Sequence, residues 1–293
     1  MRPRSRDDEQ ASPAISIVVP ARDRPAALER CLAALTSQTA TSIELVVVDD
    51  GSRDRGAVPA VVARTAPGAR IVRGEGEGPA AARNRGARVA TGEVICFTDD
   101  DCAPDPHWAQ RLAGACREGG AAAGITIVDR GAGRSAVAAQ LLTHVLQMSS
   151  LDAGTGTLAF APSCNLACSS QLARALPFDE TFPLAAGEDR DWCARLAAAG
   201  ATLRFVPDAT VTHRPRLGVG GLLRQQQRYG RGAVRFRSTG DGRRLAGRRF
   251  YTRVAREAAA AGAPVTALVM LAQVAVAAGA ATELVRPLRA TTS

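Results

Sequence analysis

The sequence contains no lysine, so all 37 of its basic residues are arginine. Its seven cysteines form no CxxC pair and have no zinc-ligand spacing, which argues against a structural zinc site and a disulfide framework and suits a reducing compartment. Residues 1–14, MRPRSRDDEQASPA, include no apolar stretch, and we therefore expect no cleaved signal peptide. Aromatic residues make up only 4% of the chain, which leaves few side chains on which nucleic-acid bases could stack.

The chain has 293 residues, 46% of them hydrophobic, which is enough for one large α/β domain with or without a helical appendage. The net charge of +9 is unevenly distributed, because residues 214–256 hold thirteen arginines and a single acid, Asp241. Such a stretch suits phosphates, nucleic acid or an anionic membrane surface, and its alternative is a solvated face. Since it has few aromatic residues and no RNA-binding signature, we expect no nucleic-acid partner.

Apolar patterns predict strands and helices that alternate as far as residue 120. Strands are expected at 14–20, 43–52, 69–78 and 94–97, and helices at 24–38, 57–66 and 79–91. Beyond residue 120 the patterns predict a strand at 121–128, a helix at 135–150, a loop at 151–163, a strand turning into a helix over 163–176, a helix at 188–200, and two short strands with a turn between them over 202–214. The alternation is typical of an α/β fold with a mostly parallel, doubly wound sheet and flanking helices.

The chain divides into three predicted parts. Residues 1–12 are expected to be a disordered tail, 13–215 the α/β domain, and 216–293 a basic, helical C-terminal region. Residues 263–285 are long enough to cross a bilayer. Because this segment is rich in alanine and contains Gln273, we favour a helix that is buried or lies on a membrane surface.

Polar groups follow three of the predicted strands: Pro20-Ala21-Arg22, Asp49-Asp50, and Asp99-Asp100-Asp101. In parallel sheets, ligands bind outside the carboxyl ends of the strands. Three successive carboxylates repel one another unless a cation neutralises them, and their oxygens suit Mg²⁺ or Mn²⁺. The alternatives for the acidic triplet are a solvated turn and the N-cap of the following helix.

Five segments within residues 14–215 occur in a characteristic order: VVPARDR, VVVDDGSRD, GPAAARNRGARVATGE, CFTDDDCAPDP and GEDRDWCARL. Together they resemble the family 2 glycosyltransferases, which have the GT-A fold. The resemblance implies transfer of a sugar from a nucleotide-diphosphate donor to an acceptor hydroxyl, with inversion and with a divalent metal, Mg²⁺ or Mn²⁺.

The resemblance also implies roles for individual residues. Asp189 would be the general base and Glu188 would position it or the acceptor, while Asp101, with Asp99 and His213, would hold the metal. Contacts to the nucleotide sugar would come from Pro20, Ala21, Arg22, Asp49, Asp50, Arg83, Asn84, Asp99, Asp100, Asn165 and Arg228. Structural alternatives stay open: a plain turn at 49–51, a solvated helix face at 83–84, helix-dipole acids at 188–189, a structural histidine at 213 and a basic amphipathic helix around 228. Tyr229 stands where processive relatives usually have tryptophan, which argues against processivity.

Two further hypotheses, a nucleotidyltransferase and an inactive transferase-like protein, are weaker. A nucleotidyltransferase would carry a glycine-rich loop after the first strand, but PARDRPAAL contains no glycine. An inactive transferase-like protein would not need Asp50, Asp99, Asp101 and Asp189. The alternative that is not an enzyme is a protein that only binds an anionic surface through its arginine-rich stretch. For the transferase, the basic C-terminal region predicts a cytoplasmic enzyme, peripheral on the inner face of the plasma membrane, with a lipid-linked or cell-envelope acceptor.

Overall fold

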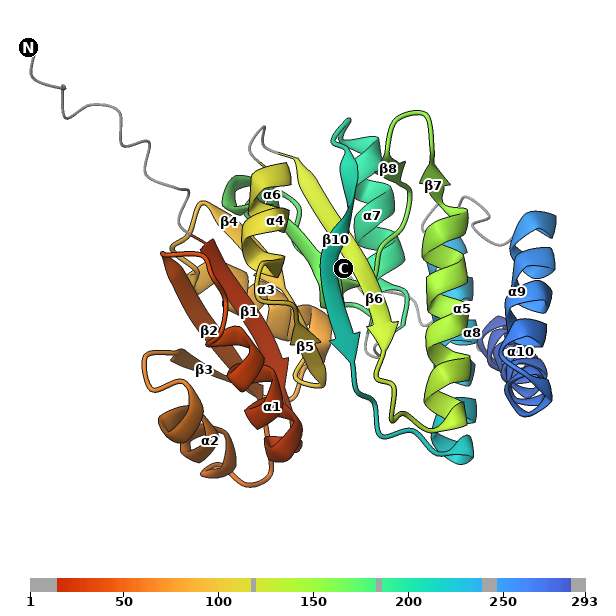
Figure 1. The fold of residues 1–293 in the computed structure, drawn as a ribbon, viewed down its shortest axis with the longest axis horizontal. Coiled ribbons are helices and arrows are strands. Elements are labelled where there is room, and N and C mark those ends of the chain that lie inside the picture. The colour runs from red at the N-terminus through yellow and green to blue at the C-terminus, as the bar shows by residue number, and fades with distance from the viewer. Residues whose placement is uncertain (1–14, 117–119, 183–185, 239–246, 286–293) are drawn as a thin grey trace, which may run out of the picture.

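The computed structural model describes residues 15–116, 120–182, 186–238 and 247–285; the predicted N-terminal tail lies outside these ranges. A ten-stranded sheet has the order β3-β2-β1-β4-β9-β6-β10-β8-β7, with β5 paired to β10 (Figure 1). Its strands are β1 (Ile15–Ala21), β2 (Ile43–Asp50), β3 (Arg70–Gly74), β4 (Val94–Phe97), β5 (Cys102–Pro104), β6 (Ala121–Val128), β7 (Leu151–Asp152), β8 (Thr157–Leu158), β9 (Leu166–Ser169) and β10 (Leu203–His213).

Helices cover the sheet, and the C-terminal helices lie beside it at one side (Figure 1). They are α1 (Pro25–Leu35), α2 (Ala57–Thr65), α3 (Pro79–Val89), α4 (Trp108–Ala115), α5 (Arg134–Ser149), α6 (Ser170–Ala175), α7 (Glu188–Ala198), α8 (Val219–Ser238), α9 (Arg248–Ala260) and α10 (Ala263–Val285), with a 3₁₀ turn, η1, at Ser163–Asn165. The alternation predicted up to residue 120 is confirmed, as are the mostly parallel sheet and the C-terminal helices.

The pairing of the strands brings their functional ends to one edge. β3, β2, β1 and β4 run parallel to one another, and β6 runs parallel to β10. β9 is antiparallel to both β4 and β6, so these two blocks of parallel strands point the same way. The carboxyl ends of β1, β2, β4, β6 and β10 therefore meet at a single edge of the sheet.

The core is split by the sheet into two apolar layers. Along β1, Ile17 and Val19 pack with α1, α2 and α4, whereas Val18 packs on the opposite face with α3. This alternation follows from the period of two in a strand, and residues on both faces are apolar because helices cover both sides.

Two local predictions were wrong. Residues 151–163, expected to be a loop, include the short antiparallel strands β7 and β8. Residues 202–214, expected to form two strands, form the single strand β10, whose pairing with β6 shifts register between Phe205 and Thr210. Pro207 lies in this interval, and because proline has no N–H it cannot continue the ladder there.

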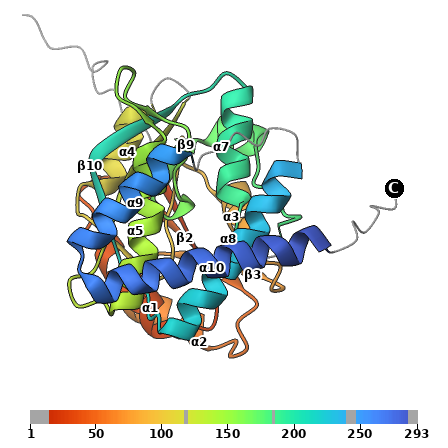
Figure 2. The ribbon, with the colours of Figure 1, turned by 90° about the vertical axis from the view of Figure 1, so that its right-hand side faces the viewer.

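The C-terminal helices pack on α5 rather than on the sheet itself. Figure 2 shows α10 lying across the face of the molecule formed by α5, α8 and α9. α8 and α10 approach closely at two glycines: a Cβ at Gly230 would lie 2.0 Å from the carbonyl oxygen of Val276, and one at Gly279 would lie 2.0 Å from that of Gln227. The backbones therefore touch without an intervening side chain.

Substitution Gly279→Ala tests this close approach. The added methyl has no room beside the Gln227 carbonyl, so we expect a loss of about 1–3 kcal/mol in the free energy of unfolding, measured by urea denaturation. Gly114→Ala on α4, where nothing lies within 4 Å of the new Cβ, is the matched control and should be neutral or stabilise by up to about 1 kcal/mol. Equal effects of the two substitutions would contradict the packing argument.

Candidate active site

Arg83 joins two of the predicted acidic segments. This arginine on α3 is 3% exposed; its Nη2 donates to Asp99 Oδ1 at 2.9 Å, and its Nη1 lies 3.4 Å from Glu188 Oε1. The guanidinium also lies 5.7 Å from the centre of the Phe178 ring. Burial alone would lower the pKa of Arg83, but the charges of Asp99, Asp189 and Glu188 outweigh burial and raise that pKa. The end of β4 and the start of α7 are thus held together by one buried cation.

Arg24 neutralises the other two acids of the triplet. It lies just before α1, and its Nε donates to Asp100 Oδ2 at 3.1 Å while its Nη1 donates to Asp101 Oδ2 at 2.7 Å. Asp100 is fully buried, and this burial raises the pKa of its carboxyl to about 7 despite the arginine. The sequence interpretation missed Arg24, although the residue is part of the VVPARDR segment that carried the resemblance.

His213, the last residue of β10, lies beside Asp101. Its Nε2 is 3.4 Å from Asp101 Oδ1, and its Nδ1 is 3.1 Å from Gln140 Oε1 on α5. Burial would lower the pKa of His213, but the hydrogen bond and the charge of Asp101 raise this pKa to about 9. The long-range pairing of β5 with β10 creates the contact, because it places His213 opposite Cys102.

Three side chains of this region form a candidate metal site. One ligand atom each from Asp101, Cys102 and His213 lies within 4.8 Å of the other two. A hydrogen bond with Cys164, together with burial, raises the pKa of the Cys102 thiol far above its usual value, so the carboxylate and the imidazole are the better donors. Asp99, predicted as a further ligand, instead pairs with Arg83.

Asp49 and Asp50 form a neighbouring cluster at the end of β2. Asp49 is buried, accepts a hydrogen bond from Ser52 N at 2.9 Å and pairs with Arg73. Asp50 accepts hydrogen bonds from Glu77 N and Gly78 N, both at 3.0 Å, and burial raises the pKa of its carboxyl. Both carboxylates therefore shape the rim of the sheet.

The end of β1 lies at this same rim. Pro20 and Ala21 are buried within β1, opposite Val48 and Asp49 of β2. Arg22, which follows them, is exposed, and its Nη1 lies 3.8 Å from Asp50 Oδ2. Arg22 is thus the residue of the predicted Pro20-Ala21-Arg22 group whose side chain is exposed, and this side chain also donates to the Gly76 carbonyl at 3.3 Å.

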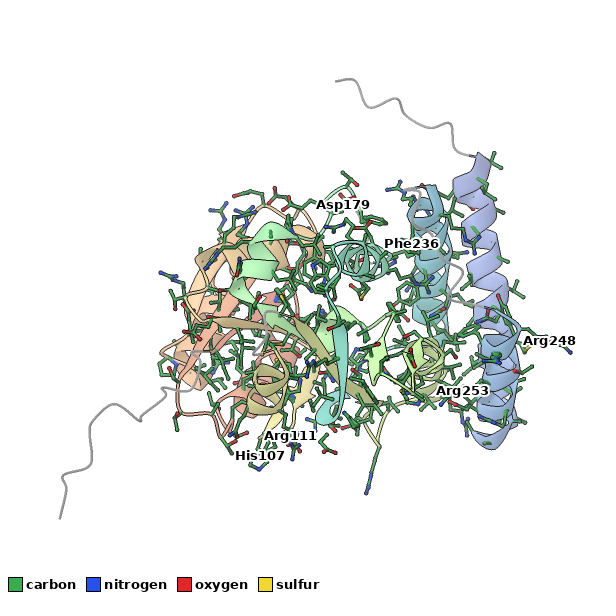
Figure 3. All side chains as sticks on the ribbon, turned by 90° about the horizontal axis from the view of Figure 1, so that it is seen from above. His107, Arg111, Asp179, Phe236, Arg248 and Arg253 are labelled. Carbon is green, nitrogen blue, oxygen red and sulfur yellow. The ribbon has the colours of Figure 1, made fainter. Side chains whose placement is uncertain are left out.

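A cavity of about 610 Å³ separates this edge of the sheet from the C-terminal helices. Its walls include Asp99, Asp101, Glu188, Asp189 and His213 on one side, and residues of α5, α8, α9 and α10, Arg228 and Tyr229 among them, on the other. In Figure 3 the C-terminal helices stand as a separate layer beside the body of the molecule, with Phe236 of α8 on the side that faces it.

Asp189 and Glu188 line this cavity, and each has one carboxylate oxygen without a hydrogen-bond partner among the described residues. Asp189 Oδ2 accepts a hydrogen bond from Ser163 N at 3.2 Å, whereas Oδ1 is buried and has no hydrogen-bond partner among the described residues. Glu188 Oε2 is buried and likewise lacks a partner within the described ranges. Burial raises the pKa of both carboxyls, and the charge of Asp189 raises that of Glu188 further. Neither oxygen is therefore occupied by a described protein group, and each can form a hydrogen bond with a ligand.

Two predicted donor-binding residues are instead part of the core. Asn165 is fully buried; its Oδ1 accepts from Trp108 Nε1 and Gly124 N, and its Nδ2 donates to the carbonyls of Ile125 and Ala209. All four hydrogen bonds of its amide are used, so none remains for a sugar. Asn84 Nδ2 donates to the Phe178 carbonyl, and its Oδ1 accepts from Phe178 N, which ties α3 to the segment after α6. The structure thus corrects both predictions.

Arg83→Met tests the central ion pair. Removal of the cation leaves Asp99 and Glu188 close together without compensation, and we expect a loss of about 3–5 kcal/mol in the free energy of unfolding. The control Arg64→Met breaks an exposed pair with Glu29 and should have an effect below about 1 kcal/mol. Addition of Glu188→Gln to Arg83→Met should restore part of the loss, because it removes one of the unpaired charges; the idea fails if the second substitution makes the protein less stable still.

Comparisons with known proteins agree with this architecture. The profile of "Glycosyl transferase family 2" matches residues 16–173. The pre-mycofactocin glycosyltransferase of Mycobacterium tuberculosis is 31% identical over 230 residues, which are 75% of this chain and 47% of that protein. Glycosyltransferase AglE of Haloferax volcanii is 28% identical over 230 residues, 76% of this chain and 73% of that protein. The chain therefore spans about half the length of the first of these relatives.

Two solved structures have the same GT-A fold. The mannosyltransferase PcManGT from Pyrobaculum calidifontis, in complex with GDP-Man and Mn²⁺, superposes with a TM-score of 0.58 at 22% identity, over 93% of this chain and 76% of that one. Glucosyl-3-phosphoglycerate synthase from Mycobacterium tuberculosis, with Mn²⁺, UDP and glucosyl-3-phosphoglycerate, gives 0.56 at 21% identity, over 78% of this chain and 80% of that one. Since the family profile covers more than half of the sequence, the chain belongs to glycosyl transferase family 2.

Proposed function

We propose that the chain transfers a sugar from a nucleoside-diphosphate donor to an acceptor hydroxyl, with inversion at the anomeric carbon. The observation that carries this proposal is the buried Oδ1 of Asp189, which has no hydrogen-bond partner among the described residues, on a residue that lines the same cavity as Asp101 and His213. A proton acceptor and a candidate metal site thus share one space, as transfer of a sugar from a diphosphate requires.

The residues present fit a divalent cation. Asp101 and His213 would hold it; the carboxylate suits Mn²⁺ and Mg²⁺ alike, whereas the imidazole nitrogen suits Mn²⁺ better, because Mg²⁺ prefers oxygen ligands. The two solved neighbours contain Mn²⁺, which supports Mn²⁺ as the ion at this site. Once bound, the ion supplies positive charge that stabilises the leaving diphosphate.

The donor nucleotide would lie along the ends of β1 and β2. There Arg22 is exposed beside Asp50, and Pro20, Ala21 and Asp49 form the rim beneath them. Arg228 of α8 lines the cavity and is exposed, so its charge is available to the diphosphate. Asp100, which is fully buried against Arg24, would support this wall rather than contact the donor.

Asp189 would take the acceptor proton during transfer. The acceptor oxygen attacks C1 of the sugar on the face opposite the diphosphate, its proton passes to Asp189, and the bond from C1 to the phosphate oxygen breaks with its electron pair leaving on the diphosphate. This in-line displacement inverts the anomeric centre. Burial raises the pKa of Asp189, which makes it a stronger base, while the charge of Arg83 favours its ionised form. Glu188, fixed by Arg83, would position the base.

Asp189→Asn should separate donor binding from chemistry. We expect Mn²⁺-dependent binding of GDP or UDP to stay within about twofold of the wild type, while transfer from the matching nucleotide sugar falls about 10²–10⁴-fold. Asp101→Asn should weaken the Mn²⁺-dependent nucleotide binding itself. Asp191→Asn is the matched control, because this acid on the same helix pairs with Arg195 and does not line the cavity. Near-normal turnover of the Asp189→Asn protein in a panel of nucleotide sugars would rule out the assigned base.

The outer face of α10 supports the further proposal that the enzyme rests on an anionic membrane. Residues 263–285 contain one charged residue, Glu283, which is turned inward to Arg231 and Arg235 at 2.9 and 2.6 Å. The large apolar side chains that remain exposed on α10 are those of Met270, Leu271, Val274, Leu284 and Val285. Among the described helices, α10 alone is long and apolar enough to span a bilayer.

The surroundings of α10 favour contact with a membrane surface over insertion. α10 packs on α8, α5 and α9, so that side is covered by protein. Arg248 and Arg249 are exposed on the neighbouring α9, and Arg248 projects from the outer layer in Figure 3. Apolar side chains flanked by arginines suit the interface of an anionic bilayer. A cytoplasmic enzyme held in this way would meet a lipid-linked or cell-envelope acceptor.

Vesicle binding tests the membrane contact. The wild type should sediment with phosphatidylglycerol vesicles at low salt and not with phosphatidylcholine vesicles. Val274→Glu, at a position that is 66% exposed, should lower the bound fraction at least severalfold, because a carboxylate would enter the apolar interface. Ile127→Glu, an exposed apolar position on β6, is the control and should bind as the wild type does. If the wild type stays in the supernatant with anionic vesicles, the proposal is wrong.

A further inference from the structure

Arg190 is a cation whose partner is missing from the described chain. It occupies the first turn of α7, directly after the proposed base Asp189, and it lines the cavity. Its guanidinium lies 5.8 Å from the centre of the Phe160 ring, and no hydrogen bond or ion pair joins it to another described residue. Burial lowers the pKa of this group and the charge of Arg237 lowers it further, although the charges of Tyr229 and Asp189 act in the opposite direction. An arginine in such surroundings normally has an anionic partner.

The α8 wall of the cavity is positive. Arg224, Arg228 and Arg237 line it, and within the described ranges none of them pairs with an acid. The acids that line the cavity are Asp99, Asp101, Glu188 and Asp189. Three of these already face cations, because Arg83 holds Asp99 and Glu188, and Asp101 meets Arg24 and His213. Positive charge is therefore in excess next to α8.

A buried amide adds an unused hydrogen-bond donor to the same wall. Gln226 is 2% exposed, and its Nε2 has no partner among the described residues. Gln226 lines the cavity and belongs to the same helix as these arginines, and an amide N–H suits a carboxylate or phosphate oxygen. Two independent observations, an unpaired guanidinium and an unpaired amide donor, thus indicate an anion at this place.

The position of Arg190 assigns that anion to the acceptor. The acceptor hydroxyl must contact Asp189, and Arg190 is the next residue of the same helical turn. The donor diphosphate, in contrast, is proposed to lie beside Asp101, His213 and Arg228. Phe160, Leu142 and Leu146 supply apolar wall for the body of the acceptor.

We propose that the acceptor carries a carboxylate or phosphate group, which binds Arg190 with help from Arg237 and Gln226. This inference rests on the proposed function, because it places the group relative to the transfer site. Arg190 would then select among hydroxyl-bearing acceptors by their charge, without taking part in proton transfer.

Anion binding to the donor-loaded enzyme tests the proposal. Sodium sulfate, as a stand-in for phosphate, and sodium acetate, as the carboxylate, are titrated by calorimetry into protein saturated with Mn²⁺ and GDP or UDP, with sodium chloride of equal ionic strength as the blank. Occupation of the diphosphate site beforehand confines the added anion to the acceptor side. We expect saturable binding of one or both anions, and the stronger of the two identifies the group.

Arg190→Met should raise the dissociation constant of the anion at least tenfold and leave Mn²⁺-dependent nucleotide affinity unchanged, while Arg190→Lys should restore part of the binding. Arg64→Met, remote on α2, is the charge-matched control. Absence of saturable binding in the wild type, or equal binding by the Arg190→Met protein, would overturn the anion site. Failure of the wild type to bind any nucleoside diphosphate would instead contradict the proposed function, so the two failures are distinguishable.

Discussion

The buried guanidinium of Arg83 is the contact on which the arrangement of the site depends. It brings a residue from the end of β4 and one from the start of α7 to the same cation, although Asp99 and Glu188 are far apart in the sequence. Without it, these two carboxylates would lie near each other with no cation between them. The same charge favours the ionised form of Asp189, the form that the proposed base would need to accept a proton. Arg83 therefore affects both the stability of the fold and the protonation of the carboxyl groups that line the cavity.

Arg24 is the second cation that compensates the acidic side chains of the site. It meets Asp100 and Asp101 in the structure, so the acidic triplet after β4 is compensated by the protein's own cations. A divalent ion at Asp101 would compete with this arginine for the same carboxylate. The affinity for the ion is therefore set partly by the ion pair that it replaces.

Local patterns predicted most of the scaffold, because the residues that decide it are close in sequence. β6 lies at residues 121–128 as expected, and α3 begins at Pro79 where the prediction placed it. The ordered motifs also located the acids at 99–101 and 188–189 that line the cavity or its margin. What the sequence could not supply is long-range pairing. The place of β9 between β4 and β6, and the contact of His213 with Asp101, depend on paired residues more than 40 positions apart.

The wrong predictions have the same origin. Asn84 and Asn165 stand in motifs near functional residues, but whether a polar side chain meets ligand or backbone depends on neighbours that only the fold supplies. Arg24 was overlooked for the converse reason, since nothing local marks it as the partner of Asp100. The sequence likewise could not predict that Gln226 Nε2 lacks a partner among the described residues, because it indicates only a basic, amphipathic helix there.

The direct contact of α8 with α10 at Gly230 and Gly279 has a mechanical consequence. Two backbones in contact leave no side-chain layer in which one helix could slide on the other. A tilt or shift of α10 must therefore carry α8 along as part of one rigid body. Since α8 bears Arg224 and Arg228, a force applied to the outermost helix would change the width of the pocket behind it.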